Sequence, residues 1–216
     1  AIELGASHAL AALAALFSPW LVRILIAPGF DPALQAETAA VMRLVLISTV
    51  IFAISAVQGS GLSSPLVSTE VAIEGVVVGD FQNNTAVDNG NLNGFYLQSY
   101  TADVDSDPLT SEGIFVYYPS GSMDIQTSDH VRGRGMISEY NGQTEITVSQ
   151  VWVCSTGNPL PVPAMLSLPV EGVNEFEPYE GMLVTFPQDL VISEYFNYDR
   201  YGEIVLTSER HMTPTA

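Results

Sequence analysis

A series of short β-branched and aromatic segments between residues 71 and 148 constrains the fold of this chain more than any other feature. The first segment, 71–81, is almost entirely apolar and predicts a long strand, with Gly75 as a candidate bend. The last two segments are joined by Asn141-Gly142, a dipeptide that favours a tight antiparallel hairpin. Further segments of the same character lie at residues 93–98, 113–118, 130–140 and 144–148.

These five strands predict a mainly β fold: a small Greek-key barrel of the oligonucleotide- or oligosaccharide-binding (OB) type. The barrel domain is expected at residues 58–150, beginning with a Gly- and Ser-rich linker. Residues 151–216 are expected to form a Pro-rich connector and additional C-terminal strands, as a partial second β unit. A Glu-Gly step shared by segments 73–78 and 179–184 suggests an internal repeat. Because an isolated pair of strands is marginal in water, packing of these strands on the barrel is the preferred interpretation.

Charge is distributed unevenly along the chain. The formal net charge is −18, and the six basic residues are all Arg. Residues 1–57 have a net charge of −1, whereas residues 58–216, with 21 acids and four Arg, have a net charge of −17. Such an acidic body repels polyphosphate unless cations or a local basic patch intervene. Cys154 is the only cysteine, which excludes a disulfide within the chain.

The N-terminal region, residues 1–57, has a different character and is expected to form an apolar helical hairpin. Residues 9–28 are nearly all apolar, and a second apolar run covers residues 39–57 with Arg43 as its only charge. Each run is roughly the 20 residues that a helix needs to cross a bilayer. The hairpin is therefore predicted to be of membrane type, spanning residues 9–57; a buried helical hairpin is the alternative.

The N-terminal region also resembles a known family. The Phe-Ser-Pro-Trp-Leu-Val-Arg sequence at 17–23, the Ala-Pro-Gly-Phe-Asp-Pro turn at 27–32 and the segment 43–48 are similar to two helices of the lipid II flippase family (MurJ/MviN). The resemblance implies a fragment of a membrane transporter, although none of that family's functional residues carries over. A second interpretation is a secretory signal peptide starting at Met42, which would export the body.

Residues 58–216 contain segments that carry a second resemblance: Gln-Gly-Ser-Gly at 58–61, 64–67, 71–82, 94–98, Asp-Val-Asp-Ser-Asp-Pro at 103–108, 110–116, Arg-Gly-Met-Ile-Ser-Glu-Tyr at 134–140, 178–184 and 198–206. Through these segments the body resembles the non-catalytic N-terminal part of secreted nucleases of the ExeM/NucH type. The resemblance implies an OB-like domain that precedes a metal-dependent endonuclease/exonuclease catalytic domain, expected beyond Ala216. Secretion or a place in the cell envelope is implied, with membrane anchoring if the hairpin is retained.

The acidic loop at 103–108 is a candidate metal site. Asp103, Asp105 and Asp107 alternate, and their carboxylates are hard oxygen ligands of the kind that Ca²⁺ or Mg²⁺ prefers. An EF-hand is excluded, because its Gly and Glu positions are occupied by Pro108 and Ile114. The alternative is a solvated loop.

A candidate nucleic-acid surface is formed by two arginines and two tyrosines. Arg132 and Arg134 alternate on one predicted strand, so their side chains share a face. With Tyr96 and Tyr140 they would stack on bases and contact phosphates, as OB barrels do with single-stranded DNA or RNA. Pairing of the arginines with nearby carboxylates is the alternative.

Taken together, the sequence predicts a nucleic-acid-binding accessory region of a secreted nuclease-like protein. No acid–base and nucleophile constellation can be assembled from these residues, so the chain by itself is not expected to be an enzyme. The alternative is a flippase-like fragment fused to an unrelated β domain.

Overall fold

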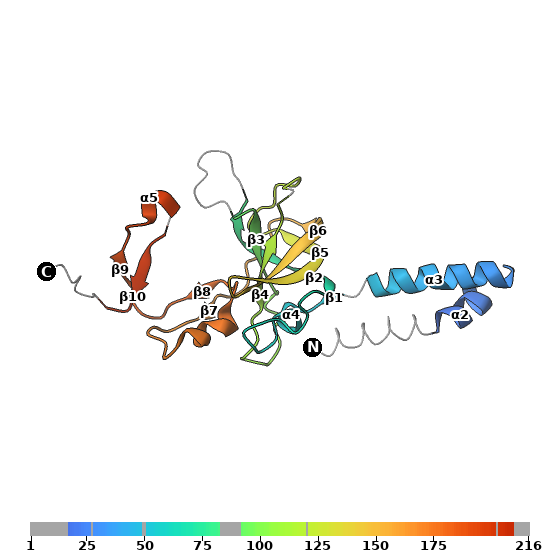
Figure 1. Cartoon of the computed structure of the whole chain (residues 1–216), viewed down its shortest axis with the longest axis horizontal. Helices are drawn as coiled ribbons and strands as arrows, with labels where there is room; N and C mark the ends of the chain where they lie inside the picture. Colours follow the sequence, from blue (N-terminus) through green and yellow to red (C-terminus); the bar gives the residue numbers. More distant parts are fainter. Residues whose placement is uncertain are drawn as a thin grey trace. The chain divides into compact units, whose positions relative to one another are not determined.

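A computed structural model describes residues 17–26, 28–48, 51–82, 92–119, 121–201 and 203–209 of the chain (Figure 1). The chain divides into two compact units, Ala1–Phe52 and Ala53–Ala216. The described part of the first unit is mainly helical, and the second unit contains every described strand except the two-residue β1.

The described residues of the first unit contain two helical segments. A short helix α2 (Ser18–Leu21) continues into a π-helical turn η1 (Val22–Ile26), and α3 (Pro32–Ser48) follows, before the two-residue strand β1 (Ile51–Phe52). Asp31 starts α3, because its Oδ1 accepts hydrogen bonds from the amides of Ala33 and Leu34 at 2.9 and 3.0 Å. This is an N-cap followed by Pro at the first helical position, where no backbone N–H is required.

Of the predicted pair of helices, the described residues contain α2 and η1 from the first run and α3 from the second, and the run 39–57 is not one helix. Helix α3 ends at Ser48, and a separate short helix α4 (Ile54–Gln58) belongs to the second unit. The sequence prediction treats α3 and α4 as one helix because both are apolar, and hydropathy does not indicate where a chain changes direction. Within the described residues, none of the helices has the length and apolar character needed to span a membrane. Residues 1–16 lie outside the described residues, and the membrane prediction stays a prediction.

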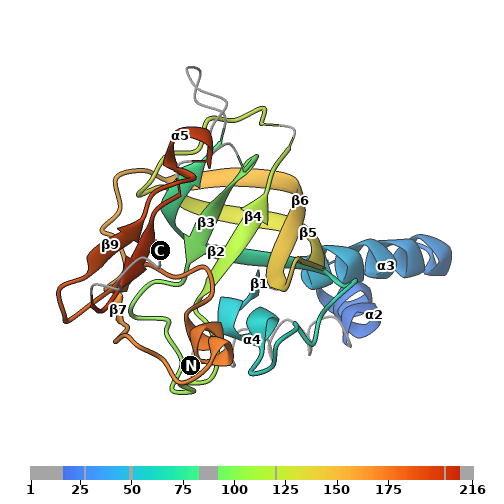
Figure 2. The same ribbon diagram turned by 60° about the vertical axis from the view of Figure 1, so that its left-hand side comes forward.

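The second unit is built around five long strands that close into a barrel (Figure 2). Neighbouring strands pair in the order β2-β3-β4-β6-β5, and β5 pairs back onto β2. Every pairing is antiparallel except β4 with β6, which is parallel. This order is the Greek-key arrangement of an OB-like barrel, as predicted. The strands are β2 (Glu70–Phe81), β3 (Gly94–Gln98), β4 (Gly113–Tyr117), β5 (His130–Tyr140) and β6 (Gln143–Ser155).

Strand β2 serves both sides of the barrel. It pairs with β5 through Glu70–Val76 and with β3 through Val76–Phe81, so it changes partners at Val76. Gly75, the predicted bend, lies beside this point. A Cβ added at Gly75 would lie 2.6 Å from the backbone oxygen of Gln98, so only glycine permits the close approach.

The predicted hairpin between β5 and β6 is confirmed. Asn141 and Gly142 both have positive φ, 53° and 84°, which is the requirement of a type I′ turn. Strand β6 continues to Ser155, further than predicted, because the N-terminal half of β5 pairs with this extension from Arg134–Gln150 to His130–Ser155. The interior is filled by fully buried side chains that include Ile73, Val76, Phe95, Leu97, Ile114, Val116, Ile137 and Ile146.

The C-terminal segment has short elements. They are β7 (Ala164–Met165), the 3-10 helix η2 (Val173–Tyr179), β8 (Val184–Thr185), β9 (Val191–Glu194), α5 (Tyr198–Tyr201) and β10 (Val205–Thr207). Strands β7 and β8 pair in parallel, and β9 and β10 form an antiparallel hairpin.

The predicted strand and repeat at 179–184 are wrong. Most of this segment is the end of η2 and a turn, since Pro178 lies inside η2 and Gly181 has a φ of 68°. Neither feature is compatible with a central strand. The turn packs instead against β4, where a Cβ on Gly113 would lie 2.3 Å from the carbonyl carbon of Gly181. The C-terminal region is expected from the sequence either to begin a second β unit or to pack on the barrel. For residues 179–184, packing on the barrel is observed.

Candidate ligand-binding face

The outer face of β3 and β4 is rich in aromatic side chains. Successive residues of a strand point to opposite faces. On β3, Phe95 and Leu97 are buried in the barrel, which leaves Tyr96 on the outside. On β4, Ile114 and Val116 point inward, and the opposite face carries Phe115, which its neighbours bury to 5% exposure, and the partly exposed Tyr117.

The aromatic rings on this face contact one another. The ring of Tyr96 meets Phe81 edge to face with centroids 5.7 Å apart, and it meets Phe115 in a tilted arrangement at 5.0 Å. Phe115 lies over Gly94, because a Cβ added there would be 2.6 Å from its Cζ. These rings form a fixed apolar surface, since aromatic pairs prefer such offset geometries.

A hollow of about 410 Å³ borders this surface. Its position corresponds to the ligand face of OB barrels, which is formed by the second and third barrel strands, here β3 and β4, and by two flanking loops. Tyr140 in its wall is 64% exposed. The lining comes from the end of the β2–β3 connection, from β4 and from the β5–β6 hairpin: Leu92, Asn93, Phe115, Tyr117, Tyr140, Gln143 and Glu145.

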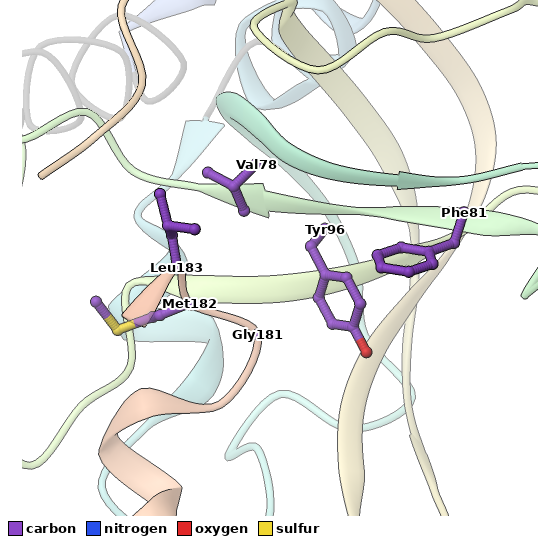
Figure 3. A pocket seen from close by; sticks show the side chains of 6 residues that line it. All are labelled: Val78, Phe81, Tyr96, Gly181, Met182 and Leu183. Carbon is purple, nitrogen blue, oxygen red and sulfur yellow. The ribbon is translucent and has the colours of Figure 1, made fainter. Parts of the chain in front are cut away.

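A second hollow of about 350 Å³ has the Tyr96 ring in its own wall. Figure 3 shows Tyr96 with Phe81 on one side and Met182 and Leu183 on the other. Its lining is mostly apolar: Val78, Phe81, Tyr96, Gly181, Met182 and Leu183. The C-terminal turn therefore supplies one wall of this hollow.

The polar groups of the face are amides, hydroxyls and one carboxylate. The side-chain amide of Gln143 donates a hydrogen bond to the Tyr96 hydroxyl at 3.1 Å. Burial raises the pKa of Glu145, a hydrogen bond from Ser138 lowers it, and the nearby Glu139 raises it. Among the described residues that line the two hollows, Glu145 is the charged one and none is basic.

The structure brings Tyr96 and Tyr140 into one region. Gln143 connects them, because it bonds to the Tyr96 hydroxyl and lies opposite Tyr140 in the β5–β6 register. Phe115 connects them as well, since it contacts Tyr96 and lines the same hollow as Tyr140.

Arg132 and Arg134 lie elsewhere on the barrel. They project from β5 beside β2, where Arg132 forms an ion pair with Glu74 and Arg134 bonds to Glu70 at 2.9 Å. At about 3.3 Å per residue, Tyr140 is about 20 Å further along β5 than Arg134. The alternative, pairing of the arginines with carboxylates, is therefore observed, and neither arginine lines the hollows that Tyr96 and Tyr140 line.

Two carboxylates of the acidic loop, those of Asp105 and Asp107, are bonded to the loop's own backbone. Asp105 Oδ1 accepts from the amide of Asp107 at 2.7 Å, and Asp107 Oδ1 accepts from the amide of Leu109 at 3.0 Å. Such bonds shape turns. No group of three or more His, Cys, Asp or Glu residues, among those described, is arranged to hold a metal ion. A site for Ca²⁺ or Mg²⁺ at Asp103, Asp105 and Asp107 stays a prediction.

Sequence reasoning missed Phe81, Phe115, Tyr117 and Gln143 as members of the face. Phe115 and Tyr117 carry a recognisable signal, because aromatic residues at alternate strand positions share one face. Which of the two faces points outward depends on the barrel register, which the sequence pattern around 113–118 does not reveal.

Comparisons with known proteins add little. No family model matches the chain, and no curated protein matches its sequence. Among solved structures, the hypothetical protein ygiW from E. coli is similar at 17% identity and a TM-score of 0.27, covering 40% of this chain and 76% of that one. OBody AM1L10, solved bound to hen egg-white lysozyme, is similar at 17% identity and a TM-score of 0.28, covering 43% and 84%.

Proposed function

We infer that this chain is a non-catalytic binding module and that the outer face of β3 and β4 is its ligand site. The observation that supports this is a cluster of aromatic side chains, in which Tyr96, Tyr117 and Tyr140 are partly or largely exposed around the buried ring of Phe115, beside two hollows at the position where OB-like barrels hold oligomers.

The chemistry of the face suits an uncharged oligosaccharide. Aromatic rings provide flat apolar surfaces for the C–H faces of sugar rings, and Asn93, Gln143 and Glu145 offer hydrogen-bonding groups for hydroxyls. A polyphosphate would meet Glu145 and no basic lining residue, on a body whose net charge is −17. The charge of the face therefore disfavours DNA and RNA.

Single-stranded DNA or RNA is the second candidate, in line with the resemblance to secreted nucleases. It is favoured by the partly exposed Arg132 and Arg134, whose guanidinium groups would have to exchange Glu74 and Glu70 for phosphates. An accessory role beside a catalytic domain, secretion, and a flippase-like membrane anchor rest on the sequence resemblances, and no described residue tests them.

Calorimetric titration distinguishes the two ligands. We expect heat of binding from a panel of neutral oligosaccharides, with an affinity that does not depend on salt. Oligodeoxythymidine should give no heat at physiological salt. Binding of oligodeoxythymidine that weakens steeply with salt would instead indicate phosphate contacts and overturn the carbohydrate assignment.

Tyr140→Ala should weaken oligosaccharide binding by about tenfold, which corresponds to about 1.4 kcal/mol for one lost aromatic contact. The fold should be unaffected because the ring is 64% exposed. Tyr195→Ala is the matched control, since Tyr195 is 74% exposed but does not line either hollow. Equal affinities for Tyr140→Ala and the unmodified chain would place the ligand elsewhere.

A further inference from the structure

Glu180 is the point at which the C-terminal turn is tied to the barrel. Its Oε1 accepts a hydrogen bond from the Gln58 side chain at 3.2 Å and another from the backbone amide of Thr144 at 2.8 Å. Its backbone oxygen accepts from Ser111 Oγ at 2.6 Å. One residue thus connects α4, the segment before β4, and β6.

The residues after Glu180 fit closely against the barrel. A Cβ on Gly181 would lie 2.9 Å from the amide nitrogen of Ile114, and Gly181 has a positive φ that favours glycine. The amide of Leu183 donates to Oε1 of the buried Gln98 at 2.8 Å. Gly181, Met182 and Leu183 then form the wall of the hollow beside Tyr96 (Figure 3).

The surroundings of the Glu180 carboxyl oppose its ionisation. Burial raises its pKa to about 7; hydrogen bonds from Gln58 and Thr144 lower the pKa, and the nearby carboxylates of Glu177 and Glu139 raise it. Glu139 is itself held in place, because its Oε1 accepts from the amide of Ser64 and from Thr144 Oγ1. The groups that donate hydrogen bonds to the Glu180 carboxyl, from α4 and β6, are neutral amides, so among the described contacts no positive charge balances its ionised form.

We propose that Glu180 is a proton-controlled latch: its neutral carboxyl holds residues 180–185 on the barrel, and its ionisation releases them and opens the hollow beside Tyr96. The latch is a property of these contacts alone, so it goes beyond the proposed function and does not depend on the class of ligand.

The direction of the pH dependence follows from linkage. The pKa in the folded chain, about 7, lies above the ordinary value of 4.5. The neutral carboxyl therefore stabilises the folded chain fully when the pH is below its ordinary pKa of 4.5. This stabilisation declines as the pH rises and is lost once the pH exceeds the folded pKa of about 7. The latch is closed in mildly acidic solution and opens through neutral pH.

Hydrogen exchange measured by mass spectrometry tests the latch in the full chain without ligand. In the unmodified chain, protection of peptides covering residues 180–185 should fall at least fivefold between mildly acidic and mildly alkaline pH, after correction for the intrinsic exchange rate. Peptides from β5 should not change. Glu180→Gln keeps the shape and the acceptor oxygen of the side chain but cannot ionise, so its protection should be independent of pH.

Two further variants make the result specific. Glu171→Gln removes one negative charge from an exposed position of the same segment and should retain the pH response of the unmodified chain. Gly113→Ala should lower protection of residues 180–185 at every pH, because its Cβ would occupy the position of the Gly181 backbone. The proposal is overturned if the unmodified chain shows no pH-dependent loss, or if Glu180→Gln loses protection in parallel with it. Ligand titrations of the same proteins test the binding face separately.

Discussion

Phe95→Ala is expected to lower the free energy of unfolding of the second unit by about 3–5 kcal/mol, the usual cost of truncating a buried phenylalanine. Phe95 is completely buried and is among the largest of the fully buried side chains in the barrel. Its removal loses the transfer free energy of the ring and leaves a cavity that the paired strands on either side cannot fill. Chemical denaturation followed by far-ultraviolet circular dichroism measures the change.

Phe196→Ala is the matched control for this prediction. The same side chain is removed, but Phe196 is 86% exposed, and the free energy of unfolding should stay within about 0.5 kcal/mol of its original value. If the two substitutions destabilised the chain equally, β3 would not be a central strand of the barrel as described.

Gly94→Ala is expected to damage both the barrel and its ligand face. The added Cβ would lie 2.3 Å from the backbone oxygen of Val116 and 2.6 Å from Cζ of Phe115. The Phe115 ring can move, but the backbone of β4 cannot do so without disturbing the sheet. We expect a loss of about 1–3 kcal/mol in the free energy of unfolding, typical of an overpacked site. Since the displaced ring also contacts Tyr96, oligosaccharide affinity should fall as well.

Gly172→Ala provides the comparison for this substitution. It adds the same methyl group in an extended backbone with no other atom within 4 Å, so both stability and binding should be unchanged. A Gly94→Ala protein with undiminished stability and affinity would show that Phe115 does not pack over β3, and the aromatic face would have to be reassigned.

Together these substitutions separate the two roles of β3. Its inward residue Phe95 contributes to the barrel interior, and its outward residue Tyr96 contributes to the face between the hollows. The face is thus built on a rigid element whose position is fixed by the core, which is how precise binding surfaces are held in place.

The sequence predicted those parts of the fold that depend on neighbouring residues. The alternation of side chains in segments such as 130–140 and the Asn141-Gly142 turn are local patterns, because strand period and turn type involve only a few adjacent residues. The Asp31-Pro32 start of α3 is a local signal of the same kind. From these patterns the five strands and their OB-like order could be expected.

Local patterns were insufficient where distant segments meet. The bond between Gln58 and Glu180 joins residues 122 positions apart, and the Arg132–Glu74 pair joins residues 58 positions apart. Such contacts depend on strand register and on how the chain returns to the barrel. For this reason the arginines could be placed on one face of β5, while their carboxylate partners on β2 were only an alternative.

The sequence by itself therefore determined the strands, the β5–β6 turn and an acidic body poorly suited to polyphosphate, because each follows from composition or from neighbouring residues. Only the tertiary structure decided which aromatic residues face outward, that Gln143 connects Tyr96 with Tyr140 while the arginines pair with carboxylates on β2, and that Glu180 lies in a partly buried hydrogen-bond network. The physical reason is that burial, register and pairing are properties of the closed barrel, and the free energies that select them arise between residues far apart in the chain.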